Sequence, residues 1–280
     1  MKQKMCMLMA ALSMMAAGLQ SCNDDEPLVV PSEVQKSFTQ MFPGEDNAGW
    51  GTRAGHYVAS FKNSGNNDVD AWFSQDGQWW MTETDIPFNA LPAAIQATFE
   101  ASEYAAWKVD DVDMLERNGL ETVYVVEVER GEQEMDLYFN INGVLFKEVA
   151  DDDDNSEHYL PESLTETAKA FLESKYPDSQ MLEIDRTKEG LLEVEIIFRG
   201  EELEITFDAN GNWMSTAREV READVPKIVL QAAIAECPGY EIDDINLVET
   251  PAAVFYAIEM EKDGAADVVV LISADGNVIK

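Results

Sequence analysis

Oxygen-bearing side chains follow a metal-binding spacing in one short segment, residues 151–162. In a calcium loop of twelve residues, oxygens at the first, third, fifth and twelfth positions coordinate the ion. Such loops need glycine at the sixth position, but Ser156 stands there, and Pro161 interrupts the end of the segment. We interpret the segment as an acidic linker, with calcium binding as the alternative. The oxygen ligands in question are Asp151, Asp153, Asn155 and Glu162.

Catalytic side chains are scarce, because the chain has two histidines and three cysteines. His56 lies in a strand-like stretch and His158 in the acidic segment, and neither is near a nucleophile turn of the Gly-x-Ser-x-Gly type. The run 49–51 lacks the lysine and the helix of a phosphate-binding loop. A pair of acidic residues does not identify a hydrolase here, because a chain with 55 Asp and Glu residues always contains many such pairs. The sequence therefore predicts no catalytic residue, no metal site and no cofactor. We expect that the protein is not an enzyme.

The strongly negative net charge excludes some classes of binding partner. The 280 residues include 19 Lys and Arg against 55 Asp and Glu, a net charge of −36. Binding to nucleic acid or to anionic membrane surfaces depends on basic side chains, so neither is an expected partner. A hydrophobic content of 46% is too high for a disordered acidic chain. We expect a folded protein with a substantial core.

Residues 1–21 have the pattern of a signal peptide. Two lysines precede a run, residues 5–19, that is apolar except for one serine and too short to span a bilayer. The residues before Cys22 resemble the lipobox of bacterial lipoproteins, although Gln20 replaces the usual small residue. Cleavage there would leave Cys22 as the acylated first residue. An ordinary signal peptide that ends near a cysteine is the alternative.

Residues 22–30 form an acidic linker in this interpretation. The acids at 24–26 resemble a surface-export signal of lipoproteins in one phylum of Gram-negative bacteria. We expect an outer-membrane lipoprotein, on the cell surface or on the periplasmic face, that contacts the membrane only through its lipid. Cys6 would leave with the signal peptide, so Cys237 would have no disulfide partner. Its apolar surroundings in the sequence favour a core residue.

Two markers repeat four times along the chain. A proline, followed three residues later by an apolar residue, suits the first turn of a helix. A turn ending in Asp-Gly or Asn-Gly suits a β-hairpin. Both markers recur every 61 to 69 residues, so four copies of one unit are predicted. The prolines are Pro31, Pro92, Pro161 and Pro226, and the glycines are Gly77, Gly143, Gly211 and Gly276.

Each unit contains four strand-like runs after its helix, so the fold class is α+β with αββββ repeats. Short connections favour antiparallel meanders with helices on one face of the sheets. The units group into two modules, residues 31–150 and 161–280, joined by the acidic linker 151–160. The turn geometry predicts cross-strand pairs under the helices. These pairs are Phe73 with Trp79, Phe139 with Leu145, Phe207 with Trp213, and Ile272 with Val278.

The opposite, helix-free face of the sheets should carry apolar rings among acids. Successive side chains of a strand alternate between faces, so Trp79 and Trp80 cannot both lie under a helix. The pattern predicts three pairs that face each other there: Trp72 with Trp80, Tyr138 with Phe146, and Leu271 with Ile279. An exposed apolar patch marks a contact surface, whereas packing against another unit is the alternative. For the tryptophan pair the contact surface is the preferred interpretation.

Tandem units of this kind behind a lipoprotein signal resemble the PepSY-like family of secreted bacterial proteins, whose fold is similar to that of the β-lactamase-inhibitor protein. The resemblance rests on the proline-led helices and the Gly-ending hairpins and covers roughly residues 28–280. It implies helices on one side of curved sheets, and binding or inhibition of other proteins through the sheet. It identifies no inhibitory residue, because the shared motifs shape the fold.

The function predicted from the sequence is therefore non-enzymatic binding of a protein partner. The candidate contact residues are Trp72, Trp80, Tyr138 and Phe146, and Cys22 is the lipidation site. Capture of a carbohydrate or another small ligand by the tryptophans is one alternative. A calcium-responsive envelope protein is the other.

Overall fold

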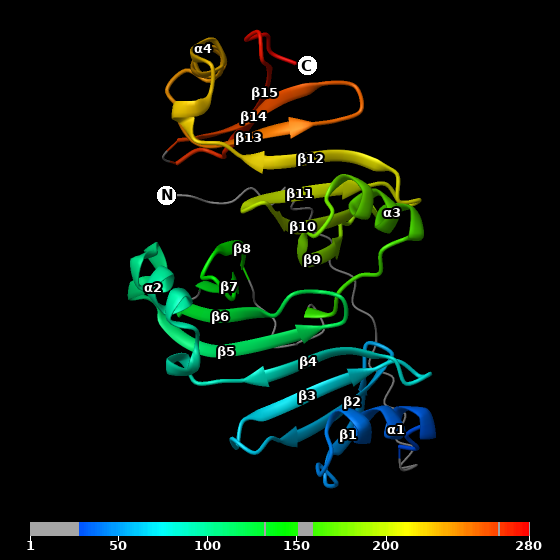
Figure 1. Cartoon of the computed structure of the whole chain (residues 1–280). Coiled ribbons are helices and arrows are strands. Elements are labelled where there is room, and N and C mark those ends of the chain that lie inside the picture. The colour runs from blue at the N-terminus through cyan, green and yellow to red at the C-terminus, as the bar shows by residue number, and fades with distance from the viewer. Residues whose placement is uncertain (1–27, 132, 151–158, 263, 280) are drawn as a thin grey trace, which may run out of the picture.

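The chain folds into two antiparallel sheets with helices packed on one face of each, as the α+β repeat pattern predicts (Figure 1). The computed structural model describes residues 28–131, 133–150, 159–262 and 264–279. The signal peptide, Cys22, His158 and residues 151–158 of the acidic run lie outside the described residues. The predicted domain boundaries therefore stay a prediction, whereas the repeated architecture is confirmed.

The eight-stranded sheet, sheet A, consists of units 1 and 2, and its strands lie side by side in chain order. Unit 1 comprises α1 (Ser32–Met41), β1 (Gly49–Arg53), β2 (His56–Lys62), β3 (Asp68–Phe73) and β4 (Trp79–Asp85). Unit 2 comprises α2 (Ala93–Ala101), β5 (Lys108–Arg117), β6 (Val123–Arg130), β7 (Gln133–Asn140) and β8 (Leu145–Ala150). Short 3-10 turns, η1 (Phe88–Ala90) and η2 (Glu103–Ala106), flank α2.

The seven-stranded sheet, sheet B, consists of units 3 and 4, again in chain order. Unit 3 comprises α3 (Glu166–Lys175), β9 (Gln180–Arg186), β10 (Leu192–Phe198), β11 (Glu201–Phe207) and β12 (Trp213–Glu219). Unit 4 comprises η4 (Glu222–Asp224), α4 (Lys227–Glu236), β13 (Glu241–Glu249), β14 (Val254–Glu261) and β15 (Val268–Ser273). Its fourth strand is reduced to one bridge, Ile272 to Val278.

The predicted pairs under the helices all form, which fixes the register of the last hairpin in each unit. Phe73 pairs with Trp79, Phe139 with Leu145, Phe207 with Trp213, and Ile272 with Val278. In units 1, 2 and 3 the register shifts by one residue immediately before this pair. The hairpin thus carries a β-bulge next to its turn, as expected for a turn closed by glycine with positive φ.

The repeated glycines touch the repeated helices, which explains why the two sequence markers share one period. Gly77 has φ +84°, and a Cβ on it would lie 2.8 Å from the Glu33 carbonyl at the start of α1. Gly143 packs against Ala94 of α2 in the same way, with the corresponding distance 2.6 Å. A side chain here would collide with the helix as well as strain the backbone. Gly211 and Gly276 contact Thr165 and Ile228 equivalently.

The third helix begins differently from the prediction. Pro31, Pro92 and Pro226 occupy the N-cap positions of α1, α2 and α4, whereas Pro161 lies four residues before the cap of α3. Thr165 is the cap there, and its Oγ1 accepts a hydrogen bond of 3.2 Å from the Ala168 amide. A threonine side chain can satisfy a free amide at a helix start, so α3 does not need the proline.

Each unit builds its own core beneath its helix. In unit 1, Val34 and Phe38 of α1 pack on Ala59, Ala71 and Phe73. The corresponding helix-face clusters of units 2, 3 and 4 centre on Ile95, Leu172 and Val229. Removing this apolar surface from water stabilises each unit by the usual ~25 cal/mol per Å².

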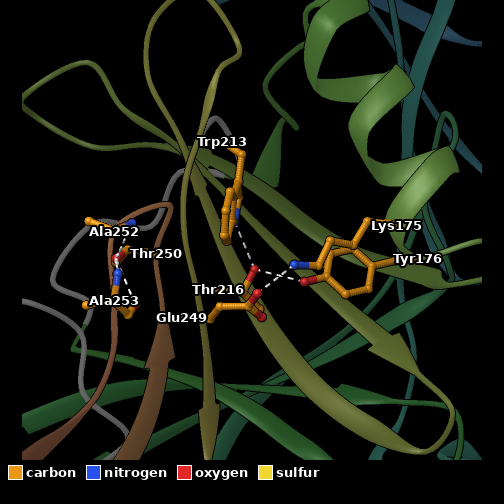
Figure 2. A network of polar contacts seen from close by, with 8 residues as sticks. All are labelled: Lys175, Tyr176, Trp213, Thr216, Glu249, Thr250, Ala252 and Ala253. Carbon is orange, nitrogen blue, oxygen red and sulfur yellow. Dashed lines mark hydrogen bonds and ion pairs between the residues drawn. The ribbon is translucent and has the colours of Figure 1, made fainter. Parts of the chain in front are cut away.

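Units 3 and 4 are joined through side chains around Thr216 of β12 (Figure 2). The Thr216 hydroxyl receives a 3.0 Å hydrogen bond from Trp213 Nε1 and contacts the Tyr176 hydroxyl at 2.9 Å. Lys175 at the end of α3 lies 4.6 Å from the Trp213 ring and pairs with Glu249 of β13 at 2.9 Å. The end of the unit 3 helix is therefore bonded to the first strand of unit 4.

Candidate interaction surface

The four predicted contact residues lie on the helix-free face of sheet A, as the alternation predicts. Trp72 stands between Val58 and Met81 on neighbouring strands, and all three belong to one cluster separate from the helix cores. Trp72 pairs with Met81 instead of Trp80, and Tyr138 pairs with Lys147 instead of Phe146. The rings of Tyr138 and Phe146 nevertheless contact each other, with their centres 6.3 Å apart. The bulge after each hairpin turn adds one residue and displaces both predicted pairings.

The expected exposure of these rings is wrong. Trp72, Tyr138 and Phe146 are 0%, 2% and 3% exposed, and Trp80 is half-buried. Tyr159 from the segment between the sheets lies 6.2 Å from Tyr138, ring centre to ring centre. Trp72, Tyr138 and Phe146 belong to a cluster that also contains residues of sheet B. The structure therefore agrees with the alternative interpretation, in which these rings pack against another unit. That cluster comprises Val58, Trp72, Met81, Leu115, Val123, Val125, Tyr138, Phe146, Tyr159 and Leu182.

Charged pairs cross the same interface between the two sheets. Arg117 of β5 is fully buried, and its Nη1 lies 2.7 Å from both carboxylate oxygens of Glu183 on β9. Its Nη2 donates to the Leu182 carbonyl at 2.7 Å. Lys147 of β8 pairs with Asp185 at 2.6 Å and lies 4.9 Å from the Tyr138 ring. These bonds hold β9, an edge strand of sheet B, against sheet A.

A backbone hydrogen bond and two side chains, each packed into the core of the other sheet, also join sheet A to sheet B. The Glu121 amide, in the turn between β5 and β6, donates to the Met181 carbonyl of β9 at 2.8 Å. Leu120 from that turn packs against the unit 3 helix-side core, whereas Ile197 of β10 packs against the ring cluster of sheet A. The part of the helix-free face of sheet A that carries the ring cluster is therefore an internal surface.

Unit 4 keeps its helix-free face accessible. Val269 and Ile279 are 43% and 39% exposed, and Leu271 between them is half-buried. The Ile279 amide donates to the Leu271 carbonyl at 2.8 Å, so the third predicted pair does lie together. Cross-strand neighbours continue the apolar strip onto β14 and β13. We call Val248, Phe255, Ala257, Val269, Leu271 and Ile279 the unit 4 face.

Acids border this face. Glu259 lies directly opposite Val269, and its Oε2 is buried without a hydrogen-bond partner among the described residues. Burial raises the pKa of Glu259, and the neighbouring carboxylates of Asp243 and Asp267 raise it further. The unit 4 face is thus an apolar strip with a negatively charged margin, on β15 at the edge of sheet B.

The remaining residues with chemical potential have structural surroundings. The His56 ring contacts the Trp80 ring at 5.4 Å, and its Nδ1 lies 3.0 Å from the Ala54 carbonyl. Cys237 is a free, buried thiol in the unit 4 core. Within the described ranges, the carboxylates close enough to share a metal ion are those of Glu83, Asp85 and Asp113. The sequence pattern did not single out these three residues.

A family model described as "Putative beta-lactamase-inhibitor-like, PepSY-like" matches residues 55–147 and 192–280. The chain belongs to the PepSY-like family. The two matched segments lie one in each sheet, which agrees with the duplicated architecture. The family resemblance inferred from the repeats is therefore confirmed. Its description is of an inhibitor-like protein and names no enzymatic activity.

Three of the solved structures that are similar to this PepSY-like chain come from Bacteroides species. A BLIP-like protein from Bacteroides fragilis is 33% identical, with a TM-score of 0.43, and the match covers 46% of this chain and 93% of the other. A DUF2874 family protein from Bacteroides ovatus is 28% identical, with a TM-score of 0.42 and coverage of 44% and 89%. One of the "putative periplasmic proteins" of Bacteroides eggerthii is 25% identical, with a TM-score of 0.41 and the same coverage.

The search of the curated proteins found no match. In the part of the chain that the structure describes, no helix has the length and apolar character of a membrane span.

Proposed function

We propose that this chain is a non-enzymatic cell-envelope lipoprotein that binds a protein partner through the unit 4 face. The observation that carries the proposal is the exposure of Val269 and Ile279 on a sheet face whose counterpart in sheet A is closed. Signal cleavage before Cys22 and acylation of its thiol and amine would anchor the protein in the outer membrane. If the partner is an enzyme and the contact covers its active site, binding would inhibit it.

The chemistry of the face favours a protein over a sugar. Saccharide rings are held against exposed aromatic faces, but Trp72 is buried and unit 4 contains no tryptophan. Apolar side chains inside a polar margin are the usual anatomy of a protein interface. Because the margin is acidic and the chain carries a net charge of −36, the partner should present an apolar ridge flanked by Lys or Arg.

The contact surface can be tested with a double variant, Val269→Ser with Ile279→Ser. We expect the wild-type chain, used as bait on native cell-envelope extract, to retain one or more proteins that the double variant loses. Ile234→Ser is the matched control, because Ile234 is an exposed isoleucine of the same unit on the helix side. If all three chains retain the same proteins equally well, the unit 4 face is not the binding surface.

The class of ligand needs a second measurement. On a glycan array, we expect no saccharide to bind the wild-type chain more tightly than the double variant. Strong saccharide binding that the double variant loses would replace the protein partner with a carbohydrate. The anchor is tested separately: Cys22→Ala should abolish incorporation of labelled fatty acid and release the protein from the membrane fraction.

A further inference from the structure

We propose that Glu83, Asp85 and Asp113 form a binding site for a hard divalent cation such as Ca²⁺ on the helix-free face of sheet A. This site uses residues other than those of the unit 4 face and of the acidic segment 151–162. Its test is therefore independent of the proposed function.

The strands bring the three carboxylates together across a β-pair. Asp85 of β4 lies directly opposite Asp113 of β5, and Glu83 precedes Asp85 by two residues and so shares its face. One oxygen of each lies within 4.8 Å of the others. Oxygens that share one Ca²⁺ at 2.3–2.6 Å are separated by up to about 5 Å, so the spacing suits a single ion.

Asp113 supplies a second, independent indication of a ligand. Its side chain is 2% exposed, and its Oδ1 accepts no hydrogen bond from the described residues. A buried carboxylate oxygen without a partner is costly, because it loses the bonds that water would make. A cation between the three side chains would replace those lost bonds.

The electrostatic surroundings are negative. The carboxylates of Glu83, Asp111, Asp85 and Glu127 all place negative charge near Asp113. The basic side chains along this face are already in ion pairs, Arg53 with Asp70 at 2.7 Å and Lys62 with Asp68 at 2.6 Å. A divalent ion bound there would neutralise part of this negative charge.

The donor set selects the class of metal. All three side chains offer carboxylate oxygen, which suits Ca²⁺, Mg²⁺ and Mn²⁺, and none offers the nitrogen or sulfur that Zn²⁺ and Cu²⁺ prefer. Ca²⁺ accepts variable numbers of ligands and irregular geometry, whereas Mg²⁺ demands a near-ideal octahedron. Three carboxylates fixed on two strands, with water in the remaining positions, fit Ca²⁺ better.

Calorimetric titration of the EDTA-treated, dialysed full chain with CaCl₂ tests the site. We expect one saturable Ca²⁺ site that Asp113→Asn weakens at least tenfold. Asp110→Asn removes the same charge from an exposed position of β5 that is in an ion pair with Lys108, and it should change the affinity less than twofold. Equal weakening by both variants would mean that only the overall negative charge attracts calcium, and the site would be wrong.

Thermal unfolding provides a second readout that does not depend on one variant. Calcium should raise the melting temperature of the wild-type chain and of Asp110→Asn, but not that of Asp113→Asn. If Asp113→Asn does not fold, Asp85→Asn takes its place, because it removes a less buried ligand of the same set. No calorimetric binding and no thermal shift with Ca²⁺, Mg²⁺ or Mn²⁺ up to about 10 mM, above the range of weak extracellular calcium modules, would overturn the proposal.

Discussion

The helix-free faces of unit 1 and unit 4 are built on the same strand pattern but meet different surroundings. Trp72 and Leu271 occupy equivalent positions, each one residue before the core residue that starts the last hairpin. Trp72 is closed in by the ring cluster at the junction of the two sheets, whereas Leu271 lies on a partly open strip. Alternation along a strand therefore decides which face a side chain occupies, and long-range packing decides whether that face is exposed.

The position of each unit in the assembly explains the difference. β9 is the edge strand of sheet B that meets sheet A, and β15 is the edge at the other end of sheet B (Figure 1). Unit 3 is thus used to close sheet A, and unit 4 is left without a covering element among the described residues. The apolar strip on unit 4 is available for a contact outside the chain.

The largest expected effect is on stability, and it should differ between the two equivalent positions, Trp72 and Leu271. Trp72→Ala should lower the free energy of unfolding by about 3–5 kcal/mol, because it leaves a cavity in a closed cluster. Leu271→Ala should lower it by less than about 1.5 kcal/mol, since Leu271 is only half-buried. Urea unfolding followed by fluorescence and circular dichroism measures both. Similar losses for the two variants would contradict the distinction between a closed and an open face.

Breaking the ion pair at the junction should have the next largest effect. Arg117→Met leaves Glu183 buried without its guanidinium partner and should cost about 3 kcal/mol or more. Arg117→Met combined with Glu183→Met removes both charges, so it should cost less than the single substitution. Denaturant unfolding of the wild-type chain, Arg117→Met, Glu183→Met and the double variant checks the cycle. A double variant that loses the sum of both single effects would show that the two side chains act independently.

A smaller, pH-dependent effect is expected from Glu195 of β10. Its Oε2 is buried without a hydrogen-bond partner among the described residues, and burial raises its pKa well above 4.5. The folded state therefore keeps the proton after the unfolded state has lost it, and stability falls as the pH rises above about 4.5. The charged neighbours that modify this pKa are Lys147, which lowers it, and Glu202, Glu183 and Glu204, which raise it.

Glu195→Gln cannot ionise, so it isolates this contribution. We expect the variant to match the wild-type chain near pH 4 and to be more stable by about 1–3 kcal/mol near pH 8, as for removal of a buried unpaired group. Thermal unfolding across this pH range measures the difference. A stability gain that is the same at both pH values would assign the effect to packing instead of ionisation.

The local structure of each unit could be predicted from the sequence, because short-range chemistry determines it. The Gly77 turn determines that Phe73 meets Trp79, and alternation places Trp72 on the opposite face. The sequence does not reveal the bulge beside that turn, so the pattern predicts Trp80 opposite Trp72, whereas Met81 occupies that position. A single extra residue in one strand cannot be recognised from the alternation along that strand. It becomes visible only when the strand is aligned with its paired neighbour.

Contacts between distant segments could not be predicted in this way. The burial of Tyr138 depends on Tyr159 and on β9, which lie beyond the end of sheet A in the sequence. The meeting of Asp85 and Asp113 depends on the register of β4 against β5, and these strands are separated by a helix and two 3-10 turns. A sequence with 55 acids offers many such pairs, and only the register selects this one.

The contact between Gly77 and the start of α1 bears on how a chain of this kind can grow. Because the first helix of a unit rests on the last hairpin of the same unit, each copy closes upon itself and brings its own apolar centre. A duplicated gene segment would therefore add an element that is already complete, and its free edge strand could take up a new role. Repeats assembled in this manner can diverge on their outer surfaces while the glycine beneath the helix stays constrained.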